Sequence, residues 1–354
     1  MTLSSRMTDR SGEWLRGSGP QSEIVISSRV RLARNIAGYP FVTRASVRQQ
    51  RDILEKFREQ VNTGRLGEQV LWVDLNECSD LDRQLLVERQ LISRQHAQDD
   101  TGKARAVAIG EEETFAVMVN EEDHLRIQVL RSGMQLIEAF NQIDQLDDAL
   151  EEQMDFAYGS KFGYLTACPT NVGTGIRVSV MLHLPALRLT GEIEKVRRAA
   201  KEMHLAVRGM FGEGSDALGD LYQISNQSTL GRSEQEILAD FQHTVVPQII
   251  AYEQQARQAL LRHRPAQLDD KVHRAWALLT HARVMDTEEV LGLLSHLRLG
   301  VNLGRIESVD IRAINDLFLL TQPAHLQRLT GSEMDPLTQR EARAALIRQK
   351  LTSR

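Results

Sequence analysis

The chain has only two cysteines, Cys78 and Cys168, in 354 residues. Two thiols are too few for a disulfide framework or a cysteine-rich zinc site, and the sequence has no C-x-x-C or H-E-x-x-H pattern. Cys78 follows a predicted strand and is expected to be structural. Cys168 stands beside glycines and an arginine in segment 168–177, which is typical of a positioned reactive group.

The sequence also lacks a run of about 18 apolar residues, and residues 1–20 lack the apolar core of a signal peptide. Its net charge of −5 and its pI near 6.1 argue against nonspecific binding to nucleic acid or to an anionic membrane. We therefore expect a cytoplasmic protein with no nucleic-acid partner and no membrane partner.

Lysine is scarce, because only seven of the 43 basic residues are lysine and the others are arginine. Genomic base composition alone produces such a bias, whereas guanidinium groups also bind phosphate bidentately where lysine offers a point charge. The sequence has no G-x-x-x-x-G-K-[ST], H-R-D or D-F-G motif, so a bound nucleoside triphosphate would depend on arginines. The candidates are Arg29, Arg31, Arg126, Arg177 and Arg208.

Residues 120–124 read Asn-Glu-Glu-Asp-His and separate two apolar runs, 115–119 and 125–130. The β-branched residues and the turn-length separation predict an antiparallel hairpin with the acidic segment at its tip. Taken alone, such a tip is most often a solvated turn. Three adjacent carboxylates repel one another, however, so the segment also favours a bound cation.

Arg29 and Arg31 lie two residues apart in a predicted strand over 23–35. In an extended strand their side chains share one face, while Val30 and Leu32 share the other. Taken alone, this pattern is typical of a half-buried edge strand with a solvated basic face. The alternative is a row of guanidinium groups that binds an anion.

The remaining pattern predicts an α+β fold, an antiparallel sheet covered by helices. Capping boxes at Ser46 and Ser132 predict helix starts, and Pro247 is expected to kink a long helix. Further strands are expected at 70–75, 106–109 and 221–226, and helices at 83–96, 192–207 and 233–263.

The length allows about two domains at roughly 100 to 200 residues each. Pro265 interrupts the helical pattern, and every predicted element after it is helical. We expect a flexible N-terminal segment at 1–21, a catalytic domain at 22–265 and a small all-helical C-terminal domain at 266–354.

Two motifs resemble those of a known family. Residues 168–175, Cys-Pro-Thr-Asn-Val-Gly-Thr-Gly, match the active-site motif of the phosphagen (guanidino) kinases, and residues 120–126 match their carboxylate loop. The blocks at 27–31, 208–209 and 224–226 follow in the family's order. Within the family the chain resembles the bacterial protein-arginine kinases, since it lacks most of the small N-terminal helical domain and carries a helical tail.

The resemblance implies a role for each matching residue. Glu122 would be the general base, Glu121 a second carboxylate that orients the guanidinium group, and Cys168 a thiolate that contacts the same group. ATP would be the phosphate donor, with Mg²⁺ bridging its phosphates and no metal ligand expected from the protein. The implied nucleotide-binding residues are Ser27, Ser28, Arg29, Arg31, His96, Arg126, Arg177, Arg208, Gly209, Gly212 and Glu213.

The resemblance also implies an activity and partners. It implies ATP-dependent phosphorylation of exposed arginines in proteins, including a heat-shock repressor, during the bacterial stress response. A small zinc-binding activator, a Clp protease that receives the marked proteins, and a homodimer are implied as well. Two other functions stay open, a small-molecule guanidino kinase and a catalytically silent adaptor that binds phosphoarginine.

The tail departs from the family pattern. The family's R-D-x-x-R-A stretch, which binds phosphoarginine, aligns with residues 339–344, Gln-Arg-Glu-Ala-Arg-Ala. Gln339 and Arg340 replace the leading arginine and aspartate, whereas Arg343 and Ala344 keep the family's residue types. We therefore expect the regulatory pocket to be altered and the kinase site to be unaffected.

Overall fold

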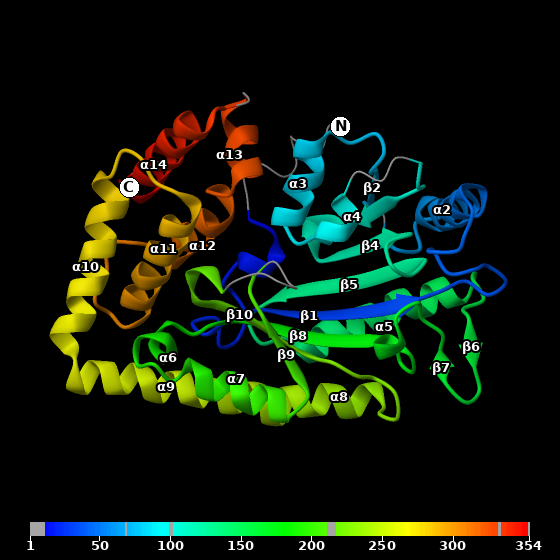
Figure 1. Cartoon of the computed structure of the whole chain (residues 1–354), viewed down its shortest axis with the longest axis horizontal. Helices are drawn as coiled ribbons and strands as arrows, with labels where there is room; N and C mark the ends of the chain where they lie inside the picture. The colour runs from blue at the N-terminus through cyan, green and yellow to red at the C-terminus, as the bar shows by residue number, and fades with distance from the viewer. Residues whose placement is uncertain (1–10, 68, 99–101, 211–216, 332–333, 353–354) are drawn as a thin grey trace.

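The computed structural model describes residues 11–67, 69–98, 102–210, 217–331 and 334–352, and its centre is one antiparallel sheet (Figure 1). The eight strands follow the order β2-β3-β4-β5-β1-β8-β10-β9. A separate two-stranded hairpin precedes β8. The strands are β1 (Val25–Arg34), β2 (Leu71–Asp74), β3 (Ala106–Ile109), β4 (Phe115–Val119), β5 (Leu125–Ser132), β6 (Tyr158–Gly159), β7 (Gly163–Tyr164), β8 (Ile176–His183), β9 (Leu205–Arg208) and β10 (Leu221–Asn226).

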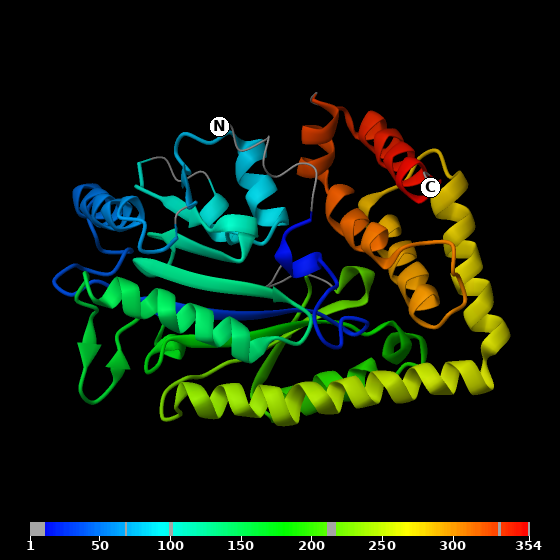
Figure 2. The same cartoon turned by 180° about the vertical axis from the view of Figure 1, so that it is seen from behind.

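Helices cover the two faces of the sheet unequally, which confirms the predicted α+β class. One face packs against α2 (Val47–Asn62), α5 (Leu136–Glu151) and α8 (Glu234–Asp240), and Figure 2 shows α5 lying across it. On the other face, α3 (Asp80–Glu88) packs over β2, β3 and β4, followed by the short α4 (Arg94–Ala97). This second face is left uncovered by these helices along β1 and β8.

β1 lies in the interior of the sheet, and Arg29 and Arg31 project from one face of the sheet. β1 pairs with β5 on one side and β8 on the other, so it is not an edge strand. Val30 and Leu32 are buried toward the α5 side, whereas Arg29 and Arg31 are partly exposed on the opposite side. The predicted row of two arginines is confirmed, and the edge-strand interpretation is wrong.

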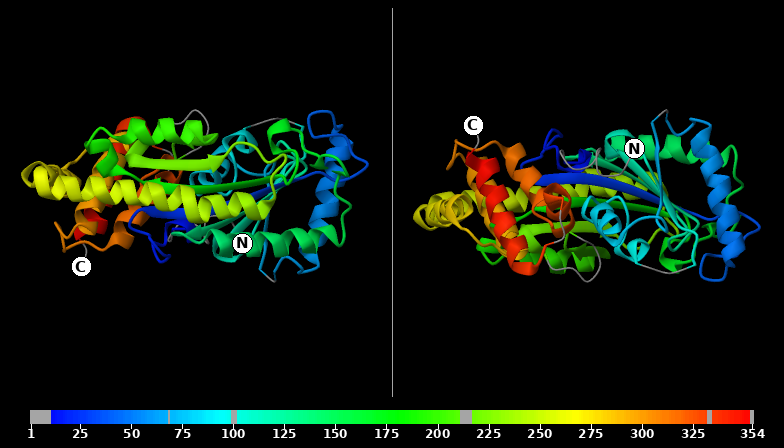
Figure 3. Two further views of the ribbon diagram at one scale, coloured as in Figure 1. Left: turned by 90° about the horizontal axis from the view of Figure 1, so that it is seen from below. Right: turned by 90° about the horizontal axis from the view of Figure 1, so that it is seen from above.

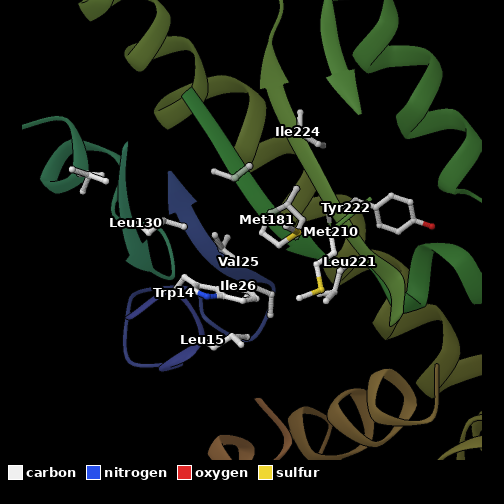
Figure 4. Packing of buried hydrophobic residues seen from close by; sticks show 14 of the residues in the cluster. Trp14, Leu15, Val25, Ile26, Leu130, Met181, Met210, Leu221, Tyr222 and Ile224 are labelled. Atoms are coloured by element: carbon white, nitrogen blue, oxygen red, sulfur yellow. The ribbon is translucent and has the colours of Figure 1, made fainter. Parts of the chain in front are cut away.

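The expectation of a flexible segment at 1–21 is wrong for the part that the structure describes. A short 3₁₀ turn, Glu13–Leu15, packs against β1 and β5, and Trp14 and Leu15 are each only 1 % exposed. Figure 4 shows Trp14 beside Ile26 of β1. Burial of two large apolar side chains holds this segment on the sheet. Residues 1–10 lie outside the described residues.

Two predicted helices are shorter than expected because tertiary pairing overrides local propensity. The helix predicted at 83–96 is divided into α3 and α4, with Gln90 at a φ of 61° between them. The helix predicted at 192–207 ends early, as α7 (Ile193–Glu202), and the chain turns at His204 into β9. β9 then pairs with β10 and extends the sheet.

One capping box is confirmed and the other is wrong. Ser46 and Gln49 form the predicted box at the start of α2. Ser132 instead pairs with Ser27 within the sheet, and α5 begins after Gln135 without a side-chain cap. Before Pro247, a π-helical turn (Phe241–Val245) separates α8 from α9 (Val246–His263), where proline removes a backbone donor.

The C-terminal helices pack together at one end of the molecule, and Figure 3 shows α9 running along its length toward them. α9 ends at His263 and α10 begins at Pro265, next to the domain boundary proposed at 265/266. Among the described residues, no helix is both long and apolar enough to cross a membrane. The other helices are α6 (Pro185–Leu189), α10 (Pro265–His281), α11 (Thr287–Asn302), α12 (Ile311–Leu320), α13 (Pro323–Thr330) and α14 (Pro336–Thr352).

Candidate functional site

The register of the sheet brings the candidate arginines to its uncovered face. Side chains directly opposite each other on paired strands project from the same face. Arg31 lies opposite Arg177 of β8 and also opposite Gln128 of β5. The five predicted arginines, Arg29, Arg31, Arg126, Arg177 and Arg208, line one cleft of about 670 Å³.

The cleft carries concentrated positive charge. Burial, followed by the charges of Arg177, Arg126 and Arg208, lowers the pKa of Arg29 to about 10. Burial and the neighbouring Arg29 lower the pKa of Arg31 well below its ordinary value. The buried Nε of Arg31 also has no hydrogen-bond partner among the described residues. Guanidinium groups that repel one another and are partly desolvated favour binding of a polyanion.

The acidic turn lies at one end of this cleft and is fixed by the surrounding backbone. Asn120 has a φ of 58°, and its Nδ2 donates to the carbonyl oxygens of Gln50 at 2.9 Å and Ala104 at 2.8 Å. Asp123 is fully buried and accepts from the Nδ2 of Asn35 at 2.7 Å and the backbone N–H of Ala167 at 2.7 Å. The interpretation of residues 120–124 as a solvated turn is therefore wrong.

Two glutamates of the turn share an arginine. Arg126 donates from Nη1 to Glu121 at 2.7 Å and from Nη2 to Glu122 at 3.1 Å. The hydroxyl of Ser93 also donates to Glu121 at 2.5 Å. The predicted cation is thus supplied, in this structure, by the chain's own Arg126.

The pKa values of these two glutamates are displaced in opposite directions. Burial alone would raise the pKa of Glu121, but Arg126, the Ser93 hydroxyl and other neighbours outweigh it and hold that pKa below its ordinary value. Burial raises the pKa of Glu122, opposed by Arg126 and reinforced by the charges of Asp123 and Glu121. Glu121 is therefore kept as an anion, and Glu122 is the stronger base of the two.

Cys168 lines the same cleft as the glutamates. It precedes the 3₁₀ turn Pro169–Asn171, and its Sγ lies 3.0 Å from the Oγ1 of Thr170. Cys78 lies outside the cleft lining, and burial raises the pKa of its thiol to about 11. Both cysteines are half-buried, and they differ in that Cys168 lines the cleft whereas Cys78 does not.

Several residues that the resemblance implied for nucleotide binding do not line the cleft. Ser28 is buried on the α5 side, where it donates to the carbonyl oxygen of Gly133 at 2.8 Å. His96 is buried with its Nε2 3.1 Å from the carbonyl oxygen of Ala106, and burial lowers its pKa to about 4. Ser27 and Gly209 are buried without reaching the cleft lining, and Gly212 and Glu213 lie outside the described residues.

Ser93 is a cleft residue that sequence reasoning missed. It caps α4 by accepting from the backbone N–H of His96 at 3.0 Å, and it contacts Glu121, which is 28 positions away in the sequence. No local pattern connects the two residues. Gln128 was missed as well, although its alternation with Arg126 on a predicted strand places both on one face.

The altered tail positions do not form an open anion pocket. Arg343 is buried and donates to the carbonyl oxygens of Thr321 at 2.8 Å and Met285 at 3.0 Å. Arg340 is exposed and pairs with Asp286 at 2.6 Å, and Gln339 precedes it on α14. The guanidinium groups of Arg340 and Arg343 are thus already paired, one with a carboxylate and the other with backbone carbonyls.

Comparison with known proteins agrees with this site. Residues 52–256 match the model of the ATP:guanido phosphotransferase C-terminal catalytic domain, and the chain belongs to this family. Residues 265–354 match the model of the protein-arginine kinase McsB C-terminal domain. Within the family, the chain belongs with the protein-arginine kinases.

Similarity to individual relatives extends over nearly the whole chain. It is 43 % identical to a protein-arginine kinase of Halothermothrix orenii, over 99 % of each chain. It is 46 % identical to one of Symbiobacterium thermophilum, over 96 % of each chain.

Solved structures share the fold over about 70 % of the chain. A duplicated taurocyamine kinase of Schistosoma mansoni matches with a TM-score of 0.60 and 26 % identity, over 72 % of this chain and 36 % of that one. A lombricine kinase matches with a TM-score of 0.57 and 25 % identity, over 70 % of this chain and 72 % of that one.

Proposed function

We propose that this enzyme transfers the γ-phosphate of ATP to arginine side chains of proteins. The observation that carries the proposal is one cleft that joins five arginines to two glutamates with oppositely displaced pKa values. The arginines suit a triphosphate, and the glutamates suit a guanidinium group. Full-length similarity to protein-arginine kinases further supports a protein-bound arginine as the acceptor.

The acceptor must lose a proton as it attacks, because a guanidinium group stays protonated in proteins, with a pKa above about 12. We assign proton removal to Glu122, whose pKa is raised. Glu121, held as an anion, accepts hydrogen bonds from the same guanidinium group and orients it. Cys168 contacts that group from the facing loop. Arg126 occupies both glutamates here and has to release them when the substrate guanidinium arrives.

The donor side of the reaction depends mainly on positioning and charge. Arg29, Arg31, Arg177 and Arg208 hold the phosphates, and Arg126 joins them when it leaves the glutamates. Mg²⁺ is usually bound by one or two carboxylates together with substrate phosphates. We propose that Mg²⁺ enters with the nucleotide, as the family resemblance implies. When bound, it neutralises charge that develops on the phosphates.

A substrate panel separates the proposal from its two alternatives. The enzyme is incubated with ATP and, separately, a folded protein, free arginine or creatine, and the products are analysed by mass spectrometry under non-acidic conditions. We expect phosphoarginine in the protein and little phosphorylation of either small molecule. Preferential phosphorylation of free arginine or creatine would indicate a small-molecule guanidino kinase. No transfer at all, with phosphoarginine still bound, would indicate an adaptor.

We further propose that the enzyme acts in a bacterial stress response. The family resemblance supports a heat-shock repressor as substrate, a small zinc-binding activator, a Clp protease that receives marked proteins, and assembly as a homodimer. Co-purification from stressed cells, followed by mass spectrometry, tests these partners. Sedimentation of the purified chain tests the dimer.

A further inference from the structure

Three of the most exposed large apolar side chains of the described residues belong to two segments that pack on the Cys168 loop. Tyr158 is 64 % exposed and Phe162 is 48 % exposed, both in the β6–β7 hairpin, and Leu230, after β10, is 56 % exposed. A Cβ atom added to Gly163 would lie 2.4 Å from the carbonyl oxygen of Gly173, and one added to Gly173 would lie 3.1 Å from the Cα of Leu230. These backbones are therefore stacked on one another. We call Tyr158, Phe162 and Leu230 the hairpin surface.

The hairpin surface is held rigidly. The backbone N–H of Tyr164 donates to the carbonyl oxygen of Gly173 at 2.7 Å, which joins the hairpin to the Cys168 loop. The ring of Tyr158 packs edge-on against Tyr164, with centroids 5.4 Å apart. The guanidinium of Arg34 lies 3.6 Å from the Tyr164 ring centroid and is itself paired with Asp147. Exposed aromatic side chains on a fixed support lose little conformational entropy when a partner binds.

The hairpin surface is continuous with the wall of the cleft. Thr170 and Asn171 line the cleft beside Cys168 and belong to the loop that runs on to Gly173. The hydroxyl of Thr229 donates to the carbonyl oxygen of Val172 at 2.7 Å, so the turn before Leu230 is fixed to the same loop. The segments that carry the apolar side chains are therefore attached to the loop that forms one wall of the cleft.

We propose that the hairpin surface binds apolar side chains that flank the target arginine in a protein substrate. This inference rests on the proposed function. An arginine that belongs to a polypeptide cannot enter the cleft alone, because the residues on either side of it must cross the cleft rim. On the Cys168 side, the segments that pack on the loop of that rim carry two exposed aromatic side chains and an exposed leucine. Exposed, contiguous apolar side chains of this kind are typical of binding surfaces, and flanking apolar residues would bury them.

The positive charge of Lys161 beside the hairpin surface implies a second preference among substrates. The Nζ of Lys161 lies 5.3 Å from the centroid of the Phe162 ring. A flanking lysine or arginine of the substrate would be repelled at this point, whereas an apolar residue would not. The surface thus selects arginines whose neighbours are apolar over arginines in basic clusters.

Two peptides of equal length test the selection. Each has one arginine, flanked by leucines in one peptide and by serines in the other, and initial rates of phosphoarginine formation are measured with the full chain. We expect kcat/KM to be about tenfold higher for the leucine peptide, mainly through a lower KM. Equal values would overturn the inference and leave the proposed function intact. No phosphoarginine in either peptide would overturn both.

Matched variants test whether the preference for the leucine peptide depends on the hairpin surface. The double variant Tyr158→Ser/Phe162→Ser should raise KM for the leucine peptide about tenfold and leave both constants for the serine peptide within twofold, which also shows that the fold is intact. Leu230→Ser should act in the same direction. Met203→Ser removes an exposed apolar side chain at the end of α7 and should change neither peptide. The double variant could instead keep its preference for the leucine peptide and form a smaller oligomer in solution than the wild type does. That result would show that the hairpin surface is a contact between copies of the chain, and it would overturn the inference.

Discussion

At the scale of single residues, Glu121 and Glu122 differ in environment more than in position. Both contact Arg126, but only Glu121 also accepts from the Ser93 hydroxyl and is almost fully buried. Displaced pKa values of neighbouring carboxylates are a means of dividing acid–base roles within one site. The environment therefore supports Glu122 as the base and Glu121 as the fixed anion.

The raised pKa of Glu122 predicts the pH dependence of the reaction. The base must be deprotonated, so the rate should fall as the pH falls through a value above the ordinary 4.5. Glu121→Gln removes a negative charge that raises the pKa of Glu122, so the acid limb of the pH–rate profile should move to lower pH. The variant should also be slower. Initial rates of ADP formation, measured against pH for the wild type and for Glu121→Gln, test both expectations. An acid limb at or below the ordinary value in the wild type would contradict the role of Glu122.

Cys168 should be the functional thiol of the chain. A serine hydroxyl can replace the thiol as a hydrogen-bonding group but is a poorer contact for a guanidinium group, so Cys168→Ser should lose most but not all activity. Iodoacetamide should inactivate the wild type by labelling Cys168, and ATP with a protein substrate should slow the labelling. Cys78, whose pKa is raised to about 11, provides the comparison, since Cys78→Ser should behave as the wild type does. Inactivation that follows labelling of Cys78 would contradict this assignment.

At the scale of elements, the Cys168 loop depends on its close contact with β1. Gly175 has a φ of +69°, and an added Cβ would lie 2.7 Å from the carbonyl oxygen of Ala33 and 2.8 Å from Nη1 of Arg34. Gly231 has a φ of +82° with nothing within 4 Å of such an atom. The two glycines therefore share a left-handed backbone and differ in crowding.

We expect Gly175→Ala to lower the free energy of unfolding by about 1 to 3 kcal/mol more than Gly231→Ala does, because the loop must move away from β1. The same movement should displace Cys168 and lower kcat, whereas Gly231→Ala should retain activity. Urea denaturation and initial rates measure the two effects. Equal destabilisation by the two substitutions would show that crowding at Gly175 is not important.

Much of the site could be predicted at this scale, for identifiable reasons. Arg29 and Arg31 follow strand alternation, and the acidic turn follows from the hairpin pattern around it. Ser93 could not be predicted, because its contact with Glu121 depends on how α3 and α4 pack over the sheet. The resemblance implied Ser27 and Ser28 through a matching block and His96 through its place after a helix. In the structure Ser27 is buried within the sheet, and Ser28 and His96 hydrogen-bond to backbone carbonyl groups.

At the scale of the whole molecule, a buried network joins α3 to α13. The carboxylate of Glu88 accepts from the backbone N–H groups of Ala324 at 2.9 Å and His325 at 3.0 Å, and lies 2.7 Å from Nδ1 of His325. Arg89 lies 3.2 Å from the other ring nitrogen of His325 and pairs with Glu113. Burial lowers the pKa of His325, which favours a neutral ring that donates to Glu88 and accepts from Arg89.

Removal of this carboxylate should destabilise the molecule strongly. Glu88→Ala leaves buried donors on α13 without an acceptor, so we expect a loss of about 3 kcal/mol in the free energy of unfolding. Glu341→Ala, at an exposed position of α14, should change it by less than about 0.5 kcal/mol. Urea denaturation followed by circular dichroism measures both. A similar small change in the two variants would contradict the importance of the network.

The composition and pattern of the sequence predict the class of the fold and the helical C-terminal region, but not this network. Sheet order depends on pairs such as Arg29 and Ser179, which are 150 positions apart. The packing of α13 on α3 depends on contacts between residues more than 200 positions apart, such as Glu88 and His325. The burial of Trp14 and Leu15 also depends on β5, which lies about 110 positions further along the chain, and no local pattern indicates this contact.

The most direct test of the central claim compares the wild type with Glu122→Gln on one protein substrate. An amide keeps the shape of the side chain but cannot take the guanidinium proton, and loss of a general base typically costs about 10² to 10⁴ in rate. Phosphoarginine is mapped by mass spectrometry under non-acidic conditions, and ATP affinity is measured by calorimetry. The account predicts phosphate on arginine side chains with the wild type, and almost none with the variant at an ATP affinity within a few-fold. Comparable turnover by Glu122→Gln, or phosphate on residues other than arginine, would contradict it.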